Sequence, residues 1–233
     1  RVVADLETAG LLLQVEDRVI ELAHSDRSKT PIEPYLADQW FISMADLAEP
    51  ALRVVREKKI QIHPERYAKS YLDWLGEKRD WPVSRQLWWG HQIPIWHVSD
   101  VTRQEIEDTF SNDTAVAWTP DGDDSDDRHP RGWFVCSANE NLGVDAINGK
   151  PLVRDPDVLD TWFSSALWPH STLGWPTETE LLKRFYPTST LVTSRDIITL
   201  WVARMVILGI FNTGEIPFHH VSIHPKILDR YCE

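Results

Sequence analysis

The last third of the chain has the most regular pattern of apolar and polar positions. Residues 195–212 are apolar almost all round and are followed by Gly214, which predicts a long buried helix with a glycine stop. A short apolar run at 188–193 and an alternating run at 218–224 predict strands on either side of it. Strand, helix and strand at this spacing predict a right-handed βαβ unit of a parallel sheet, as in a Rossmann-like half.

Apolar residues also recur at helical spacing in shorter segments. Pro64 suits the first position of its helix, because that position needs no backbone N–H donor. The further helices are predicted at residues 2–13 with a break at Gly10, 44–59, 64–78, 157–167 and 178–185.

Two segments between these helices have a different pattern. Residues 80–96 mix aromatic and apolar side chains with Gly90 and Pro94, which predicts an extended, partly buried chain. Residues 99–150 have the character of an insertion, with a short helix near 104–110. The sequence therefore predicts an α/β protein with an inserted α+β region.

Composition and charge narrow the functional classes. The chain is 42% apolar and 26% charged, as is usual for a globular protein, and its net charge of -12 argues against a surface that coats nucleic acid. This charge leaves room for a local basic site. The apolar stretch at 197–211 is interrupted by Arg204 and is short for a membrane span, and no signal peptide is recognisable. We therefore expect a cytoplasmic location without a membrane partner.

Candidate metal sites have simpler interpretations. Cys136 and Cys232 are too few for a disulfide framework or a four-cysteine zinc site. The acidic run 121–127 lacks the glycine and the final glutamate of a calcium loop, so a solvated loop is expected. Of the strand histidines, His219 points away from His220 and His224, which favours strand positions near a nucleotide over a metal centre.

The chain has no glycine-rich dinucleotide motif, no phosphate-binding loop and no hydrolase or zinc-protease motif. Four longer blocks are more informative: DVLDTWFSSALWP (157–169) followed by STLGWP (171–176), DWPVSRQLWWGHQIPIW (80–96), DIITLWVARM (196–205) and the segment 34–44. These blocks resemble the valyl-tRNA synthetases, which are class I aminoacyl-tRNA synthetases. Isoleucyl enzymes usually have WGTPIP and WFDSG where this chain has WGHQIP and WFSS.

The resemblance implies a domain organisation. Residues 1–38 are expected to be the exit segment of the hydrolytic editing domain. Residues 39–233 are expected to be the second half of a Rossmann-like catalytic domain, with the insertion at about 99–150. The family motifs HIGH and KMSKS are both missing from these 233 residues, and both ends resemble cuts through a longer protein. No catalytic residue is therefore assigned, and we expect the chain alone to be inactive.

The resemblance also implies a pocket for the substrate amino acid. Trp162 and Trp201 would form its walls, because a branched aliphatic group needs a rigid apolar slot. The alternative is that either tryptophan is an ordinary core residue. Asp160 would orient the substrate from its helix, with a solvated helix surface as the alternative.

Residues at the predicted strand-to-helix junction are expected to bind adenosine and its ribose. Thr193 and Ser194 would lie against the sugar, and the Asp196 carboxylate would accept hydrogen bonds from ribose hydroxyls. Asp196 could instead cap the long helix. The family usually has glycine at the position of Ser194, so the backbone approach to the sugar is expected to differ.

Two further expectations follow from the resemblance. Arg79, Asp80 and Trp81 resemble a peptide that places the acceptor end of tRNA. Many relatives have a pair of zinc-binding cysteines where this chain has Ser25 and Ser28, and serine is a poor zinc ligand. We therefore expect no zinc, with hydrogen bonds in its structural role.

The implied reaction joins valine and ATP, with Mg²⁺, into valyl-adenylate and then transfers valine to its tRNA. Two other functions remain open. The chain could be a non-catalytic assembly or tRNA-binding module that associates with itself through an exposed half-sheet. It could also be part of an isoleucyl-tRNA synthetase.

Overall fold

The computed structural model describes residues 1–26, 28–111, 113–121, 132–139, 141–226, 228 and 230. The chain divides into two compact units, Arg1–Asp38 and Gln39–Glu233. The first unit contains one helix, α1 (Val2–Thr8), which has no buried residue. This helix is shorter than the predicted segment 2–13 and is followed by Gly10 in the left-handed conformation, at φ 68°. Among its described residues, the rest of the first unit is mostly extended chain with a turn near Ser25.

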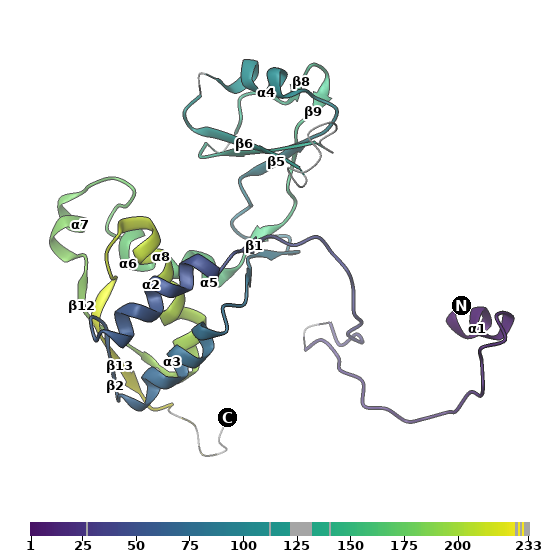
Figure 1. Cartoon of the computed structure of the whole chain (residues 1–233), viewed down its shortest axis with the longest axis horizontal. Coiled ribbons are helices and arrows are strands. Elements are labelled where there is room, and N and C mark those ends of the chain that lie inside the picture. Colours follow the sequence, from purple (N-terminus) through teal and green to yellow (C-terminus); the bar gives the residue numbers. More distant parts are fainter. Residues whose placement is uncertain are drawn as a thin grey trace. The chain divides into compact units, whose positions relative to one another are not determined.

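The second unit is built around a three-stranded parallel sheet. Its order is β12 (Thr188–Ser194), β13 (Phe218–His224) and β2 (Gln61–His63). Leu191, Val221 and Ile62 lie side by side across the three strands and belong to one buried core. The parallel pairing of β12 with β13, joined by a helical segment, confirms the predicted strand–helix–strand unit (Figure 1).

The helical segment between β12 and β13 changes character along its length. It begins as a 3₁₀ turn (Arg195–Ile197), continues as a π-helical turn (Ile198–Val202) and becomes the α-helix α8 (Ala203–Thr213). The expectation of one regular helix is therefore wrong for its first two turns. The predicted glycine stop is confirmed, because Gly214 adopts φ 76° directly after α8.

The segment Arg195–Thr213 is also the one described helix that is long and apolar enough to cross a bilayer by length and composition. The expectation that it is too short is not met by those criteria. Half of its most apolar window is buried inside the protein, however, and residues 203–209 are all buried. This burial is typical of a core helix.

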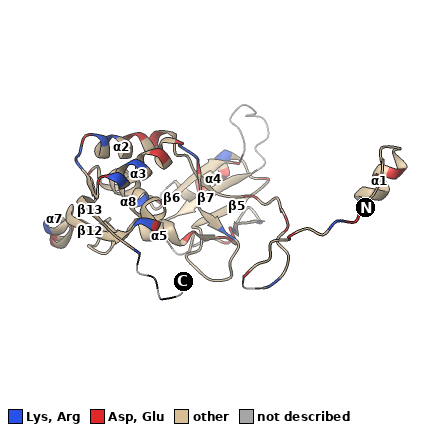
Figure 2. Cartoon of the chain, turned by 90° about the horizontal axis from the view of Figure 1, so that it is seen from below, with Lys and Arg blue, Asp and Glu red and all other residues tan. Residues whose placement is uncertain are grey.

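Helices α2 (Ala45–Arg56) and α3 (Arg66–Gly76) pack beside α8 and the sheet, and both confirm their predicted segments (Figure 1). Their buried residues, such as Leu52 and Tyr71, belong to the same core. Pro64 is not the first residue of α3, because it directly follows β2 and the helix begins at Arg66. The outer faces of α2 and α3 carry both acidic and basic residues (Figure 2).

The predicted insertion has a small core of its own. An antiparallel sheet in the order β10-β5-β7-β6 packs against α4 (Arg103–Phe110), which confirms the predicted short helix. The Thr102 side chain and Glu105 cap α4 reciprocally. Most of the acidic run 121–127 lies outside the described residues. The strands of this region are β5 (Ile95–Val98), β6 (Val116–Pro120), β7 (Trp133–Ser137), β8 (Ala146–Ile147), β9 (Lys150–Pro151) and β10 (Val153–Arg154).

Short strand pairs connect the insertion to the core. β1 (Phe41–Ile42) pairs with β3 (Trp81–Pro82), and β4 (Ser84–Arg85) pairs with β11 (Val158–Leu159). Together with β5 these strands confirm the extended prediction at both ends of the segment 80–96, whereas residues 88–90 form a bend. Three short helices follow β11: α5 (Thr161–Ala166), α6 (Trp168–Ser171) and α7 (Glu180–Phe185).

Two predicted elements need correction. The helix predicted at 157–167 begins only at Thr161, because Val158 pairs with β4 and the local helical pattern yields to this contact. The strand predicted as buried at 188–193 is β12, in which only Leu191 and Thr193 are buried. Leu191 and Thr193 alternate with the exposed Thr190 and Val192, so only one face of this strand is covered.

Candidate functional site

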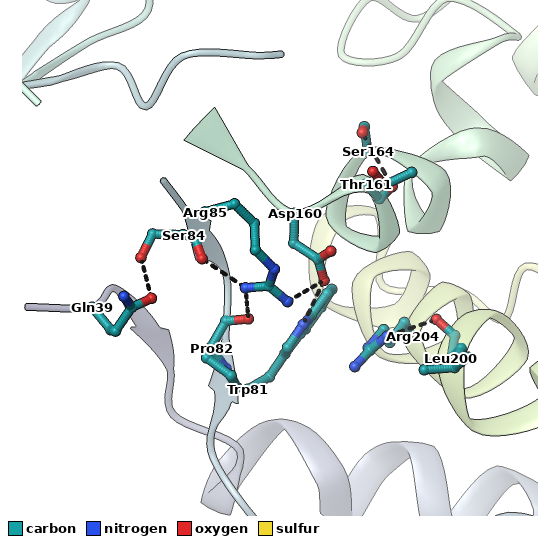
Figure 3. A network of polar contacts seen from close by, with 10 residues as sticks. All are labelled: Gln39, Trp81, Pro82, Ser84, Arg85, Asp160, Thr161, Ser164, Leu200 and Arg204. Atoms are coloured by element: carbon teal, nitrogen blue, oxygen red, sulfur yellow. Dashed lines mark hydrogen bonds and ion pairs between the residues drawn. The ribbon is translucent and has the colours of Figure 1, made fainter. Parts of the chain in front are cut away.

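A buried carboxylate, Asp160, lies where β11 meets α5 (Figure 3). The residue is 5% exposed, so the expectation of a solvated helix surface is wrong, and it precedes α5 instead of lying within it. Its Oδ2 accepts a hydrogen bond from Trp81 Nε1 at 3.3 Å and forms an ion pair with Arg85 at 3.4 Å. The backbone N–H of Asp160 donates to the Val83 carbonyl at 2.7 Å. Asp160 thus joins α5 to the strands β3 and β4.

The Arg85 guanidinium is held by the backbone as well as by Asp160. Its Nη1 donates to the carbonyl oxygens of Pro82 at 3.1 Å and Ser84 at 2.6 Å (Figure 3). The Ser84 hydroxyl donates to Gln39 Oε1 at 2.9 Å. The ion pair is therefore part of a connected network, and Asp160 has little freedom to turn away.

A second cation, Arg204 of α8, lies on the other side of Trp81. Its guanidinium carbon is 4.4 Å from the Trp81 ring centroid, and its Nη1 donates to the Leu200 carbonyl at 3.0 Å. Burial lowers the pKa of Arg204, the Asp160 carboxylate raises it, and Arg85 lowers it. Because arginine stays protonated in proteins, Asp160 and the Trp81 ring stabilise a desolvated charge. The Nε atom of Arg204 has no hydrogen-bond partner.

The two tryptophans expected to wall an amino-acid pocket lie on neighbouring elements. Trp162 is on α5 and Trp201 is on the π turn, and both are half-buried against the main core. Trp201 Nε1 donates to the Ser165 carbonyl at 2.9 Å, which connects the π turn to α5. Its ring is 5.9 Å from the ring of Trp168. Because its only polar atom is already bonded, the Trp201 indole offers an apolar surface.

The residues expected to bind adenosine lie at the carboxyl end of β12. Thr193 is buried, and the Ser194 hydroxyl is buried without a hydrogen-bond partner. Asp196 forms ion pairs with Lys226 at 3.6 Å and with Arg195 at 3.4 Å. The helix-capping interpretation of Asp196 is wrong, because Ser194 occupies the cap position and no side-chain cap bond is present. The carboxyl ends of parallel strands are where open α/β sheets bind ligands.

The strand histidines do not form a metal centre among the described residues, where no group of three metal-binding side chains occurs. His220 Nδ1 lies 3.4 Å from His63 Nε2 on the neighbouring strand β2. The ring centroids are 5.6 Å apart. The two nitrogens therefore point toward one another, as in a hydrogen-bonded pair, and do not converge on a shared ligand position.

The three residues expected at the acceptor end of tRNA do not share one environment. Arg79 is exposed and pairs with Glu77 at 2.9 Å. Asp80 Oδ1 accepts from the backbone N–H of Met44 at 2.9 Å, at the start of α2. Trp81 is 4% exposed and lies in the Asp160 network. Only Arg79 has its charged group at the surface and free of backbone contacts.

Hydrogen bonds connect the turn at Ser25 and Ser28. The backbone N–H of Ser28 donates to Ser25 Oγ at 3.3 Å, and the hydroxyls of Ser28 and Thr30 lie 2.7 Å apart. The Lys29 N–H donates to the Ser25 carbonyl at 2.8 Å.

Sequence reasoning missed Arg85 and Arg204, which hold Asp160 and Trp81 in place. Arg204 was recognisable as the one charged residue of the apolar stretch 197–211, since such a cation must find a partner when it is buried. Nothing in the local pattern around Arg85 identifies its partner, because Asp160 lies far along the chain.

Comparisons with known proteins show which family this chain resembles. A family model described as tRNA synthetases class I (I, L, M and V) matches residues 4–231. The chain is 58% identical over 239 aligned residues to a valine–tRNA ligase of Rhodopirellula baltica, covering 98% of this chain and 23% of that protein. A valine–tRNA ligase of Dehalococcoides mccartyi is 44% identical and matches 98% of this chain, which spans 22% of it. The chain thus spans less than a quarter of the length of these relatives.

One solved structure supports the fold. The methionyl-tRNA synthetase of Mycobacterium tuberculosis, bound by methionyl-adenylate, superposes with a TM-score of 0.51 and 17% identity. The match covers 90% of this chain and 30% of that protein. The Rossmann-like α/β fold of class I synthetases is therefore shared.

Proposed function

This chain belongs to the class I tRNA synthetases, and we propose that it is the part of a valine–tRNA ligase that binds valine and adenosine. One observation carries the proposal: 58% identity over 98% of the chain to a valine–tRNA ligase. Because the chain spans only 23% of that relative, the complete activity is proposed for a longer enzyme in the cytoplasm. Residues 1–38 are assigned to the exit segment of its editing domain, and residues 39–233 to its catalytic domain with the insertion at 99–150.

The proposed reaction has two steps. A valine carboxylate oxygen attacks the α-phosphorus of ATP, pyrophosphate leaves, and valyl-adenylate forms. A hydroxyl of the 3′-terminal tRNA ribose then attacks the valyl carbonyl carbon, and AMP leaves. Both steps depend on alignment of the reacting groups and on stabilisation of phosphate charge. Mg²⁺ would neutralise phosphate charge, but the described residues offer no cluster of ligands for it, so no step is assigned to it here.

In this proposal Trp162 and Trp201 form the walls of the valine pocket. The bond from Trp201 Nε1 to the Ser165 carbonyl fixes the indole on the π turn against α5, which carries Trp162. Asp160 at the start of α5 holds that helix through Trp81 and Arg85. We assign Asp160 a positioning role, because its carboxylate is already engaged by these two side chains.

The proposed adenosine site is the carboxyl end of β12. The Ser194 hydroxyl is buried and has no partner, so a ribose hydroxyl brought to this end would satisfy it. Asp196 would accept hydrogen bonds from the ribose after its exposed ion pair with Lys226 opens. Exposed ion pairs of this kind contribute only about 0–1 kcal/mol, so opening it costs little.

Calorimetric titration with non-hydrolysable valyl-, isoleucyl- and threonyl-adenylate analogues tests the pocket. The valyl analogue should bind selectively, and Trp162→Ala or Trp201→Ala should weaken it. Trp118→Ala is the matched control, since Trp118 packs on the separate core of the insertion. Equal binding of all three analogues, or equal loss in the control, would contradict the assignment.

The chain alone is expected to be inactive, because the motifs HIGH and KMSKS are not among its residues. Valine-dependent pyrophosphate exchange by the purified chain would contradict this expectation. A hydrophobic pocket rejects threonine by only about 10²-fold, so the longer enzyme would need its editing domain for accuracy.

A second candidate function is self-association. In the described sheet β12 and β2 are outer strands, and Val192 of β12 is 64% exposed. Open strand edges with apolar side chains favour pairing with another chain. Sedimentation velocity at rising concentration should reveal dimers, and Val192→Lys should reduce them; a monomer at all concentrations would rule this candidate out.

A further inference from the structure

Arg204 is a buried cation that holds the π turn between β12 and α8. The residue is 9% exposed, and its Nη1 donates to the Leu200 carbonyl at 3.0 Å. Leu200 lies in the π turn and directly precedes Trp201. Such turns are rare and occur frequently at functional sites. The Arg204 side chain therefore fixes the backbone at the residue before Trp201.

Two aromatic rings hold the charge of this guanidinium. Its carbon lies 4.4 Å from the Trp81 ring centroid and 5.9 Å from the Trp74 ring centroid. Its Nε atom is buried and has no hydrogen-bond partner. Because a buried charge is costly to desolvate, well-packed apolar side chains often replace one without loss of stability. Stability of the core alone therefore does not explain an arginine at this position.

Trp81 connects Arg204 to the element that carries the second tryptophan of the proposed pocket. Its Nε1 donates to Asp160 Oδ2 at 3.3 Å, while the Arg204 guanidinium lies over its ring (Figure 3). Asp160 directly precedes α5, and Trp162 is the second residue of that helix. One indole thus lies between the residue that holds the start of α5 and the residue that holds the π turn.

α5 and the π turn are joined a second time at Trp201. The Trp201 Nε1 donates to the Ser165 carbonyl of α5 at 2.9 Å, and its ring lies 5.9 Å from the Trp168 ring. Both connections are next to residues of the proposed valine pocket. The separation of Trp162 and Trp201 therefore depends on the two connections together, of which one passes through Arg204.

The rigidity of these walls decides which side chains such a pocket can separate. Isoleucine is larger than valine by one methylene, and one methylene in an apolar pocket is worth about 10–200-fold in discrimination. A close-packed wall resists the larger side chain, because even one methylene is felt there. A wall that can move back accommodates it.

We propose that Arg204 is a positioning residue that sets the separation of Trp162 and Trp201 and thereby excludes isoleucine from the valine pocket. This role rests on the proposed function, because it concerns the walls of the same pocket. The guanidinium is committed to Leu200 and Trp81, so its effect on the bound amino acid is indirect.

Titration calorimetry of the 233-residue chain with valyl- and isoleucyl-adenylate analogues gives the ratio of the two affinities. Arg204→Met keeps an unbranched side chain but removes the charge and the bond to Leu200, so it should lower this ratio at least about five-fold. Arg204→Lys can still donate to the carbonyl and lie over Trp81, and it should restore most of the ratio. Arg184→Met is the matched control, since the exposed Arg184 also lies over an aromatic ring, that of Phe185 at 5.3 Å.

A second measurement needs no ligand. The indole N–H resonance of Trp201, identified by its loss in Trp201→Phe, should move in Arg204→Met because the π turn is no longer held. The resonance of Trp118, which packs on the separate core of the insertion, should stay in place. Circular dichroism checks that each variant is folded.

Two results would overturn the role of Arg204 alone. Arg204→Met could change only the free energy of unfolding and leave the ratio of affinities as it is, or the Trp201 resonance could stay in place. An unsubstituted chain that binds both analogues equally would overturn the proposed valine pocket as well. The two failures are therefore distinguishable.

Discussion

Removal of the Asp160 carboxylate is the sharpest test of the network in Figure 3. In Asp160→Ala the buried Trp81 Nε1 loses its acceptor, which costs about 1–3 kcal/mol. Arg204 also loses the carboxylate that offsets its burial. Removing one member of a buried ion pair costs about 3–5 kcal/mol, but Arg85 is 39% exposed and can turn to water. We therefore expect a loss of about 2–4 kcal/mol in the free energy of unfolding.

Asp160→Asn separates the two contributions, because an amide oxygen still accepts from Trp81 while the charge is gone. It should cost less than Asp160→Ala, by about 1–2 kcal/mol. Urea unfolding followed by circular dichroism gives both values, provided that the dependence on urea stays equal among the variants. A change within about 0.5 kcal/mol for Asp160→Ala would refute the reasoning, since it would mean that the carboxylate supports neither Trp81 nor Arg204.

Two further predictions concern the core and the loop. Burial lowers the pKa of His170, so the folded chain binds fewer protons than the unfolded chain at a pH near this pKa. The contribution of His170 to the free energy of unfolding should therefore be complete above about pH 6.5 and should decline as the pH falls below that value. Free energies of unfolding measured between pH 7.5 and 5.5 should show this decline in the unsubstituted chain, and His170→Asn should make the pH dependence flatter. An unchanged pH dependence in His170→Asn would contradict the assignment of the decline to His170. Gly90→Ala should lower the free energy of unfolding by about 1–3 kcal/mol, because of its φ of +151° and the contact with Val158. Gly76→Ala, where a Cβ meets open space, is the thermal-denaturation control, and an equal shift in both would contradict the strain argument.

Much of the parallel sheet was predictable because its signals are local. The apolar run before Gly214 and the alternating pattern at 218–224 identify the strand–helix–strand unit without any knowledge of partners. The start of α5 was not predictable in this way. Val158 and Leu159 fit a helical pattern, but pairing with β4 draws them into a strand, and this contact lies more than seventy positions away in the sequence.

Only part of the candidate site was predictable, because several of its contacts join residues that are distant in the sequence. The positions of Trp162 and Trp201 on neighbouring elements agree with the resemblance, but their role as pocket walls stays a prediction. Trp81 belongs to a segment that resembles a peptide placing the acceptor end of tRNA, and that role stays a prediction. Its ring is buried between Asp160 and Arg204. Burial of a tryptophan depends on which cation and which carboxylate reach it from other elements, and a linear sequence does not contain that information.

The π-helical turn at Ile198–Val202 sets the rotation about the helix axis between the residues that precede it and helix α8. Each residue of an α-helix advances by about 100° around the axis, so removing one residue from this turn would rotate Asp196 by that amount relative to α8. Asp196 stands before the turn, Trp201 lies within it and Arg204 follows it. The π turn therefore sets the rotation of the preceding residues about the helix axis relative to α8. With one residue fewer in the turn, Asp196 at the end of β12 and Trp201 beside α5 would no longer both face their present neighbours.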